Sequence, residues 1–177
     1  LEYNFKVFSI PTILDWENQK EISQKVKNIE IEDLLERDPI VLDNVAISKQ
    51  LKGKTILITG AAGSIGSEIV RQILNFEPKK IIILDQAETP LHHIGLEVET
   101  IKKNVVIRSI VADIRDKTAV ERVFKLYKPD MVYHAAAYKH VPLVEHNPIE
   151  GIRNNVLGTY HTAQAARAMG VKHVVLI

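Results

Sequence analysis

Three glycines stand between an apolar run and an amphipathic stretch in the sequence LITGAAGSIGSEIV, residues 57–70. In a turn from strand to helix, Gly60 allows a sharp reversal, Gly63 lets backbone approach a diphosphate, and Gly66 permits close helix packing. The unpaired N–H groups of a helix N-terminus favour negative charge, so a diphosphate can bind there without a lysine. The spacing Gly-x-x-Gly-x-x-Gly differs from the most familiar fingerprint, but its place between a strand and a helix predicts a dinucleotide site.

Carboxylates stand at the ends of the next two predicted strands. Asp85 follows the loop by roughly 20 residues, where a carboxylate can bind the two hydroxyls of an adenosine ribose. This favours NAD over NADP, because the sequence DQAETP offers no arginine for a 2′-phosphate. In VADIRD, Asp113 and Ile114 are candidates to border the adenine. Each aspartate has an alternative role, as a cap of the element that follows its strand.

Apolar runs alternate with amphipathic stretches from Lys54 onward. The runs are short, β-branched and apolar on both faces, as in a parallel sheet covered by helices and joined by right-handed crossovers. They read KTILITG, KKIIILD, NVVIRSIVAD, DMVYHAAA and KHVVLI. This pattern predicts an α/β fold, a Rossmann-type doubly wound parallel sheet of five strands in the order 3-2-1-4-5.

Four helices are expected between these strands. They cover residues 64–76, 89–102, 117–128 and 148–169. For the last of them, Asn147 is a natural N-cap and Pro148 suits the first helical position. Gly170 then provides the C-terminal stop.

Residues 1–51 differ from the rest in being charged and weakly patterned. FKVFSIP could be the last strand of a preceding domain, and a short helix should end before Pro39. A second helix should be capped by Asp43. We therefore divide the chain into an N-terminal helical arm or linker, residues 1–51, and a Rossmann half-domain, residues 52–177. Because the chain begins at Leu1 and ends on HVVLI, we expect it to be a fragment.

Composition narrows the class of protein. The chain has 177 residues, 46% of them hydrophobic, and a formal net charge of +1. No Lys/Arg block provides an electrostatic footprint for a nucleic acid or an anionic membrane. No run reaches the ~18 apolar residues of a transmembrane helix, and we find no signal peptide. The sequence contains no cysteine, which excludes thiolate chemistry and suits a cytoplasmic location.

The histidines do not suggest a metal site. His134, His140 and His146 are evenly spaced, but their spacing is not a helical i, i+4 pair and no carboxylate cluster accompanies them. We expect no metal. His134 should lie near the core and His140 near the pocket, whereas the pair His92 and His93 should lie on a partly solvated helix face.

Four motifs taken in order resemble the extended short-chain dehydrogenase/reductase superfamily. They are TGAAGSIG, VADIRD, HAAAYKHVPLVEHNP and NNVLGT. More narrowly, HAAAYKHVPL and GSIGSEIVRQIL are similar to the nucleotide-sugar 4,6-dehydratases of bacterial surface-polysaccharide biosynthesis, which act on UDP-N-acetylglucosamine. The resemblance covers about residues 29–177, and IEDLLERDPI is similar to their long, membrane-anchored branch.

This resemblance implies a set of cofactor-binding residues. Residues 59–66 would hold the pyrophosphate, Asp85 the ribose, and Asp113 with Ile114 the adenine edge. The alanines after the fourth strand would pass beneath the cofactor, and Lys139 and Asn155 would reach its ribose or phosphate. By number, the set is Thr59, Gly60, Gly63, Ser64, Ile65, Gly66, Asp85, Asp113, Ile114, Ala135, Ala136, Ala137, Lys139 and Asn155. The alanines could instead mark a tight strand–helix contact, and Lys139 and Asn155 could be surface or capping residues.

The resemblance also implies a reaction. The nicotinamide takes hydride from C4 of the sugar, water leaves across C5 and C6, and hydride returns to C6. The proton-transfer residues of the family are expected beyond Ile177, so the chain alone would bind the cofactor without catalysis. The complete protein would take a UDP-sugar substrate, form a homo-oligomer and meet a membrane only through its missing N-terminal part. The alternatives are an epimerase or reductase of the same superfamily and a non-catalytic nucleotide-binding or assembly module.

Overall fold

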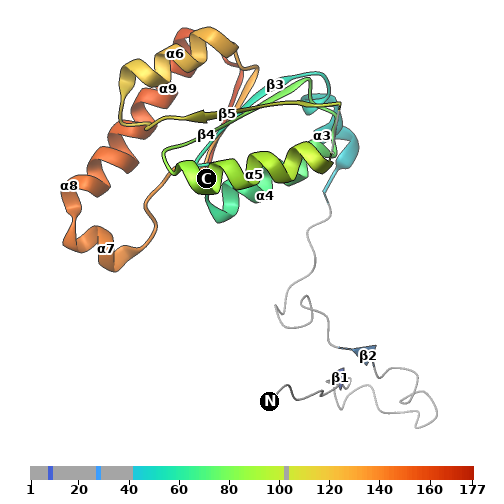
Figure 1. Ribbon diagram of the computed structural model, residues 1–177, viewed down its shortest axis with the longest axis horizontal. Helices are drawn as coiled ribbons and strands as arrows, with labels where there is room; N and C mark the ends of the chain where they lie inside the picture. Colours follow the sequence, from blue (N-terminus) through green and yellow to red (C-terminus); the bar gives the residue numbers. More distant parts are fainter. Residues whose placement is uncertain (1–7, 10–26, 29–41, 102–103) are drawn as a thin grey trace. The chain divides into compact units, whose positions relative to one another are not determined.

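The computed structural model describes residues 8–9, 27–28, 42–101 and 104–177 (Figure 1). The chain divides into two units, Leu1–Leu42 and Asp43–Ile177. In the first unit, β1 (Phe8–Ser9) and β2 (Lys27–Asn28) pair in antiparallel fashion. The role of FKVFSIP as the last strand of a preceding domain stays a prediction, and the helix expected before Pro39 lies outside the described residues.

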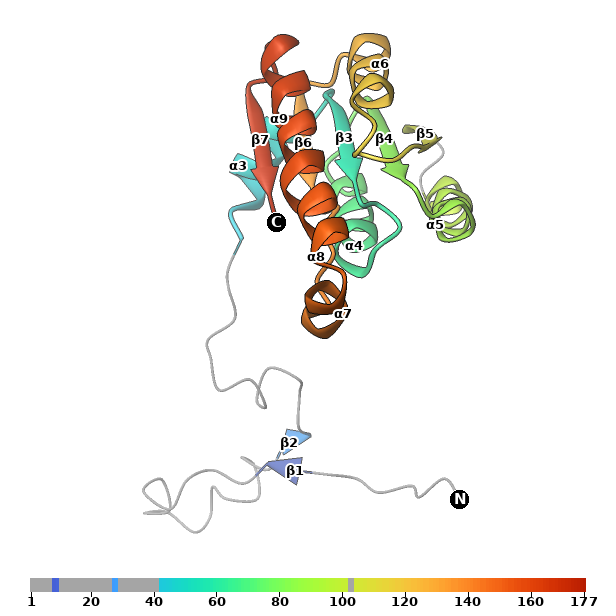
Figure 2. The same ribbon diagram turned by 90° about the vertical axis from the view of Figure 1, so that its left-hand side faces the viewer.

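The second unit is built on a parallel sheet. Its described residues form β3 (Thr55–Thr59), β4 (Lys80–Asp85), β5 (Val106–Val111), β6 (Met131–His134) and β7 (His173–Leu176). The strand order is β5-β4-β3-β6-β7, and all neighbouring pairs are parallel. This confirms the predicted Rossmann-type order 3-2-1-4-5. The order reverses between β3 and β6, which lie side by side in Figure 2.

Helices cover both faces of the sheet (Figure 1). On one face lie α3 (Asn44–Leu51), α4 (Ser64–Leu74) and α5 (Glu88–Ile101), and on the other lie α6 (Lys117–Tyr127) and α9 (Thr159–Ala168). Side chains alternate along each strand, so Ile56 and Ile58 pack with the first group while Leu57 packs with the second. No helix within the described residues is long and apolar enough to cross a bilayer.

Helix α3 groups with the sheet. The Asp43 carboxylate accepts hydrogen bonds from Val45 N at 3.1 Å and Ala46 N at 3.0 Å, which confirms the predicted cap. Leu51 is 2% exposed and packs into the core together with Ile47, because these side chains give α3 an apolar face. The sequence had placed residues 44–51 with the arm, whereas the compact unit begins at Asp43. The functional division into an arm and a half-domain stays a prediction.

The segment after β6 contains several short helical elements, whereas the sequence predicted a single helix over residues 148–169. The structure has α7 (Val141–His146), α8 (Pro148–Gly151), the π-helix η2 (Ile152–Gly158) and then α9. A π-helix adds a residue to each turn without breaking the axis, so the sequence pattern still resembles one helix. Helix α7 was not predicted from the sequence.

The ends of this helical segment follow the prediction only in part. Pro148 stands in the first turn of α8, and Gly170 ends α9 with a φ of +66°. Asn147 occupies the N-cap position, but its side chain makes no capping bond. Its Nδ2 instead donates to Leu143 O at 2.9 Å, because α7 ends beside it and offers a nearer acceptor. The predicted capping role of the Asn147 side chain is therefore wrong.

Candidate functional site

The glycine loop packs directly against the backbone that follows β6. Gly60 has a φ of +69°, and a Cβ there would lie 2.5 Å from the carbonyl carbon of Ala135. A Cβ on Gly66 would collide with the carbonyl oxygen of Gly60, so α4 can lie this close to β3 only with glycine. Gly63 is the N-cap of α4 and supplies no side-chain acceptor to the N–H groups of its first turn. Those groups are available to an anion.

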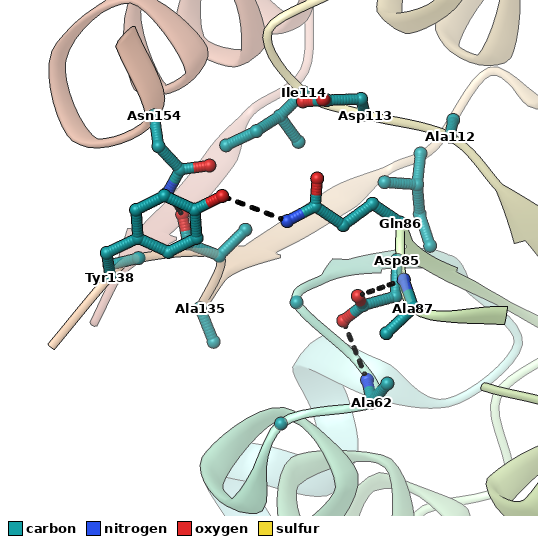
Figure 3. Close-up of a pocket in the computed structure, with 15 residues that line it drawn as sticks. Ala62, Asp85, Gln86, Ala87, Ala112, Asp113, Ile114, Ala135, Tyr138 and Asn154 are labelled. Carbon is teal, nitrogen blue, oxygen red and sulfur yellow. Dashed lines mark hydrogen bonds between the residues drawn. The ribbon is translucent and has the colours of Figure 1, made fainter. Parts of the chain in front are cut away.

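Asp85 ties the end of β4 to the glycine loop. Its Oδ2 accepts from Ala62 N at 3.0 Å and its Oδ1 accepts from Ala87 N at 2.9 Å (Figure 3). The second bond lies one residue before α5, so the carboxylate also orders the start of that helix. Each carboxylate oxygen has lone pairs left for a further donor, such as a hydroxyl group. Both of the roles considered for Asp85 are therefore compatible with its contacts.

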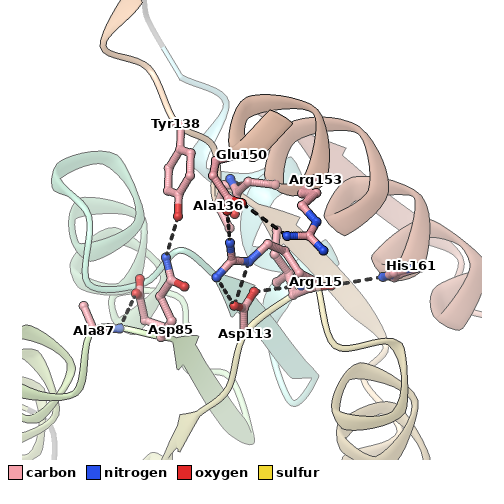
Figure 4. A network of polar contacts seen from close by, with 12 residues as sticks. Asp85, Ala87, Asp113, Arg115, Ala136, Tyr138, Glu150, Arg153 and His161 are labelled. Carbon is pink, nitrogen blue, oxygen red and sulfur yellow. Dashed lines mark hydrogen bonds and ion pairs between the residues drawn. The ribbon is translucent and has the colours of Figure 1, made fainter. Parts of the chain in front are cut away.

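Asp113 belongs to an ion-pair network that fixes the loop after β5 to α8 (Figure 4). Its Oδ1 accepts from Arg115 N at 2.8 Å, and its Oδ2 lies 2.6 Å from the Arg115 guanidinium. This guanidinium holds the pKa of the Asp113 carboxyl below its usual range. Arg115 also contacts Glu150 at 2.5 Å, and Glu150 contacts Arg153 at 3.3 Å. The charge of Arg115 is thus shared between two carboxylates.

Two consecutive asparagines of the π-helix hold the segment after β6. Asn155 Oδ1 accepts from Tyr138 N at 2.8 Å, and Asn155 Nδ2 donates to Tyr138 O at 3.0 Å. Asn154, which is 4% exposed, donates from Nδ2 to Ala136 O at 3.3 Å and to Asn155 Oδ1 at 3.0 Å. The pair binds the backbone from Ala136 to Tyr138 much as a neighbouring strand would. The π-helix therefore positions one wall of the site.

A buried histidine lies beneath this wall. His134 is 2% exposed, and its Nδ1 is 2.7 Å from the hydroxyl of Thr59. Its Nε2 is 2.9 Å from the hydroxyl of Thr159. Burial lowers the pKa of His134 to about 4. The predicted core-adjacent position of His134 is confirmed, and the neutral ring joins β3, β6 and α9.

Two adjoining cavities occupy the edge of the sheet where the strands end. One, of about 240 Å³, is lined among others by Asp85, Asp113 and the three alanines that follow β6. The other, of about 680 Å³, is lined by the first turn of α4, by Lys139 and by residues of α7. They share Gly63, Ala135, Ala137 and Tyr138 in their walls. Together they form one trough across the point where the strand order reverses.

Twelve of the fourteen residues predicted for the site line this trough. They are Gly60, Gly63, Ser64, Ile65, Gly66, Asp85, Asp113, Ile114, Ala135, Ala136, Ala137 and Lys139. Thr59 and Asn155 do not line it. Their side chains are bonded instead to His134 and to the backbone of Tyr138, respectively. Both act on the lining from behind.

Other residues of the trough were missed from the sequence. Gln86, Tyr138 and Asn154 line the smaller cavity, and Gln86 Nε2 donates to the Tyr138 hydroxyl at 3.3 Å. Figure 3 shows these two side chains meeting across the cavity. Each is next in sequence to a predicted residue, and that adjacency was the available signal. The second cavity also draws on α7, whose existence was not predicted.

Residues 56–177 match the family described as polysaccharide biosynthesis protein. The chain belongs to this family. The probable polysaccharide biosynthesis protein EpsC of Bacillus subtilis is 47% identical over 154 residues, which cover 86% of this chain and 26% of EpsC. The capsular polysaccharide biosynthesis protein CapD of Staphylococcus aureus is 45% identical over 173 residues, 97% of this chain and 29% of CapD.

The chain thus spans between a quarter and a third of the length of these two relatives. A Campylobacter jejuni protein named UDP-N-acetylglucosamine 4,6-dehydratase (inverting) is 36% identical over 126 residues, 71% of this chain and 36% of that protein. Among solved structures, Pen from Bacillus thuringiensis has a TM-score of 0.66 at 34% identity, covering 71% of this chain and 39% of that one. The UDP-glucose 4-epimerase of Thermus thermophilus in complex with NAD has a TM-score of 0.57 at 31% identity. The match covers 68% of this chain and 36% of the epimerase chain.

Proposed function

We propose that this chain binds NAD in the trough and is the cofactor-binding part of a UDP-N-acetylglucosamine 4,6-dehydratase of surface-polysaccharide biosynthesis. The observation that carries the proposal is the meeting of the glycine loop, Asp85 and Asp113 around one cavity where the strand order reverses. In open α/β sheets, ligands bind at this switch point, beyond the carboxyl ends of the strands. The name of the Campylobacter relative and the NAD in the Thermus structure support it.

The shape of the trough fits a diphosphate-linked dinucleotide. Gly63 lines both cavities and carries no side chain, so a diphosphate can approach the loop backbone at the first turn of α4. The Lys139 ammonium lies 3.4 Å from the Ser64 hydroxyl and adds a positive charge beside that turn. Ala135 and Ala137 line both cavities, and their small side chains leave space for a ligand to extend from one cavity into the other.

The ribose end favours NAD over NADP. Asp85 would accept hydrogen bonds from the ribose hydroxyls but would repel a 2′-phosphate. Arg115 is the arginine nearest to Asp113 in sequence, and two carboxylates already hold its guanidinium. A 2′-phosphate would have to compete with both of them for it. We therefore propose that the adenosine ribose of the bound cofactor has a free 2′-hydroxyl, as in NAD.

The chemistry that NAD⁺ supplies when bound is hydride acceptance from C4 of the sugar and its return to C6. The residues of this chain would hold and orient the cofactor. Asp85 and Asp113 would fix the adenosine end, and the α4 N-terminus would hold the diphosphate. Lys139 would face the nicotinamide half beside the larger, mainly apolar cavity. We assign the proton transfers, by resemblance, to residues that follow position 177 in the complete protein.

Titration calorimetry with NAD⁺ and NADP⁺ tests the cofactor assignment. We expect the dissociation constant of NAD⁺ to be at least about tenfold lower than that of NADP⁺, which corresponds to about 1.4 kcal/mol of binding free energy. Asp85→Ala should weaken NAD⁺ binding and reduce the preference. Asp116→Ala, which removes the N-cap carboxylate of α6, is the control and should leave both titrations unchanged. Tighter binding of NADP⁺ would refute the role given to Asp85.

The reaction is tested separately from the cofactor. The chain alone should not convert UDP-N-acetylglucosamine, whereas a longer protein that spans the full length of the relatives should yield the 4-keto-6-deoxy product. A 4-epimer from the extended protein would favour the epimerase alternative, which the Thermus structure supports. No turnover of any UDP-sugar, with NAD bound, would favour a non-catalytic nucleotide-binding or assembly module. For the complete protein we propose a homo-oligomer with this part in the cytoplasm and any membrane anchor in the N-terminal region.

A further inference from the structure

Lysines precede most of the strands at the sheet edge opposite the trough. Because the strands are parallel, all of them start at this edge, and the register aligns Thr55 with Lys80 and Met131 with His173. Lys54, Lys79 and Lys172 each stand one residue before the starts of β3, β4 and β7. Residues far apart in the sequence therefore meet here, although the sequence itself contains no basic block.

Four lysines, among them Lys54 and Lys172, surround one open depression of about 440 Å³. They are Lys49, Lys54, Lys128 and Lys172, and His173 lies beside them. We call this group the lysine edge. Asp130 is the carboxylate among the lining residues, and its Oδ2 is already bonded to Thr55 N at 2.8 Å. Positive charge therefore exceeds negative charge locally by several units, in a chain whose formal net charge is +1.

The lysine edge gathers around one depression four basic side chains that have no carboxylate partner among the described residues. All four side chains are exposed, and none forms an ion pair within residues 42–101 and 104–177. Lys52, in contrast, contacts Glu77 at 2.9 Å, and Arg115 has two carboxylate partners. Unpaired like charges repel one another, and an anionic surface would relieve that repulsion.

We propose that the lysine edge docks the protein onto the headgroups of anionic lipids at a bilayer surface. The basic groups are ammonium ions on flexible stems, which act as point charges toward a diffuse negative surface. The lining contains no arginine and no Phe, Tyr or Trp, the side chains with which single-stranded nucleic acids are stacked and bound. Docking at this edge leaves the trough, at the opposite edge, facing away from the bilayer.

The proposal does not depend on the function proposed for the trough. Each lysine near an anionic surface contributes about a fivefold gain in partitioning, so four together give several hundredfold. The attraction acts within a Debye length, about 10 Å at 0.1 M salt, and weakens as salt is added. Binding should therefore be salt-dependent and should need negatively charged lipid.

Vesicle co-sedimentation of the 177-residue chain tests the proposal. The vesicles contain either equal parts of phosphatidylglycerol and phosphatidylcholine or phosphatidylcholine alone. We expect binding to the first and not to the second, with release as NaCl is raised from about 0.05 M to about 0.5 M. Neutralising Lys49, Lys54, Lys128 and Lys172 to glutamine should lower the partition coefficient by about a hundredfold or more.

A matched variant separates the lysine edge from net charge. It neutralises Lys117, Arg122, Lys125 and Arg167, which are exposed on α6 and α9, and loses the same four charges. This variant should keep most of the binding. Equal losses in both variants, equal binding to uncharged vesicles, or salt-dependent binding of a single-stranded RNA in preference to vesicles would overturn the proposal. Circular dichroism of both variants shows whether they are folded, and failure to bind NAD⁺ would leave this result unaffected.

Discussion

The hydroxyl of Thr59 and Nδ1 of His134 lie 2.7 Å apart in the core, at the ends of neighbouring strands. The other ring nitrogen lies 2.9 Å from the Thr159 hydroxyl, so both nitrogens are satisfied while the ring is neutral. One nitrogen of a neutral imidazole donates and the other accepts, and threonine hydroxyls can do either. Protonation would place an unpaired charge in a buried site. The ring therefore secures the backbone beneath the glycine loop only while it is uncharged.

The first prediction is that His134 makes the protein sensitive to acid. Burial lowers the pKa of His134 to about 4, compared with 6.5 for the exposed group. The unfolded chain therefore binds more protons, and the free energy of unfolding falls as the pH drops from about 6.5 to about 4. At 1.4 kcal/mol per pKa unit, the loss approaches about 3 kcal/mol. Urea unfolding at several pH values between 4 and 7.5 measures it.

Two variants identify the group responsible. His134→Asn should be less stable than the parent at pH 7.5 but should lose less stability on acidification. His92→Asn removes an exposed histidine of α5 and should keep the parent's full pH dependence. The same acid-induced loss in His134→Asn as in the parent would show that other groups cause it.

The second prediction separates the structural glycine from the ligand-facing one. Gly66→Ala forces a Cβ into the carbonyl oxygen of Gly60 and should reduce the free energy of unfolding by about 3 kcal/mol or more. Gly63→Ala meets that oxygen at 3.3 Å and should remain folded. Its added methyl group would nevertheless stand where a diphosphate must approach. Thermal unfolding should therefore show a large loss of stability for Gly66→Ala and a small one for Gly63→Ala, and NAD⁺ calorimetry should show weakened binding by the folded Gly63→Ala protein. A Gly66→Ala protein as stable as the parent would contradict the packing argument.

The sheet could be predicted from the sequence because buried parallel strands leave short apolar runs that helical patterns do not imitate. The site residues at strand ends followed from the same pattern, since Asp85 ends the run KKIIILD and Asp113 ends the run NVVIRSIVAD. The π-helix could not be predicted, because residues 152–158 carry no pattern that distinguishes one extra residue per turn. Helix α7 was missed because its residues Val141–His146 bury no side chain and so lack an amphipathic pattern.

Other features of the site depend on contacts between residues far apart in the sequence and could not be predicted from it. The roles of Thr59 and Asn155 in ligand binding stay predictions, and the structure adds that their polar groups are bonded to His134 and Tyr138, from 75 and 17 residues away. No local pattern reports such pairings. The lysine edge shows the same limit, since the fold brings together lysines from α3, from the end of α6 and from the residues before β3 and β7.

The third prediction concerns the hold of Asn155 on Tyr138. Asn155→Leu removes an acceptor and a donor and should lower stability by about 1–2 kcal/mol. The specific readout is hydrogen exchange at the Tyr138 amide, which donates to Asn155 Oδ1 at 2.8 Å and should lose its protection. Asn155→Asp keeps that acceptor and should retain protection at Tyr138. Unchanged exchange in the leucine variant would mean that the backbone is held by other contacts.

The last prediction concerns the outer edge of β7. Within the described residues β7 pairs only with β6, and Val174, Leu176 and Ile177 are 45%, 64% and 53% exposed. An apolar edge strand with unpaired backbone groups promotes association, whereas the opposite edge strand β5 carries Arg108 and Ser109. We expect the 177-residue chain to self-associate through β7, so that its mass by light scattering rises with concentration.

A lysine on this strand tests that expectation, because a charge on an edge strand opposes pairing with a second strand. Leu176→Lys should reduce the association. Leu126→Lys, at an α6 position that is 68% exposed, adds the same charge away from the edge and should not. Hydrogen exchange at Val174 to Leu176 should be slow in the associated state and fast on dilution. A chain that stays monomeric at every concentration, with these amides strongly protected, would show that β7 is stable as an unpaired edge and would rule out association through it.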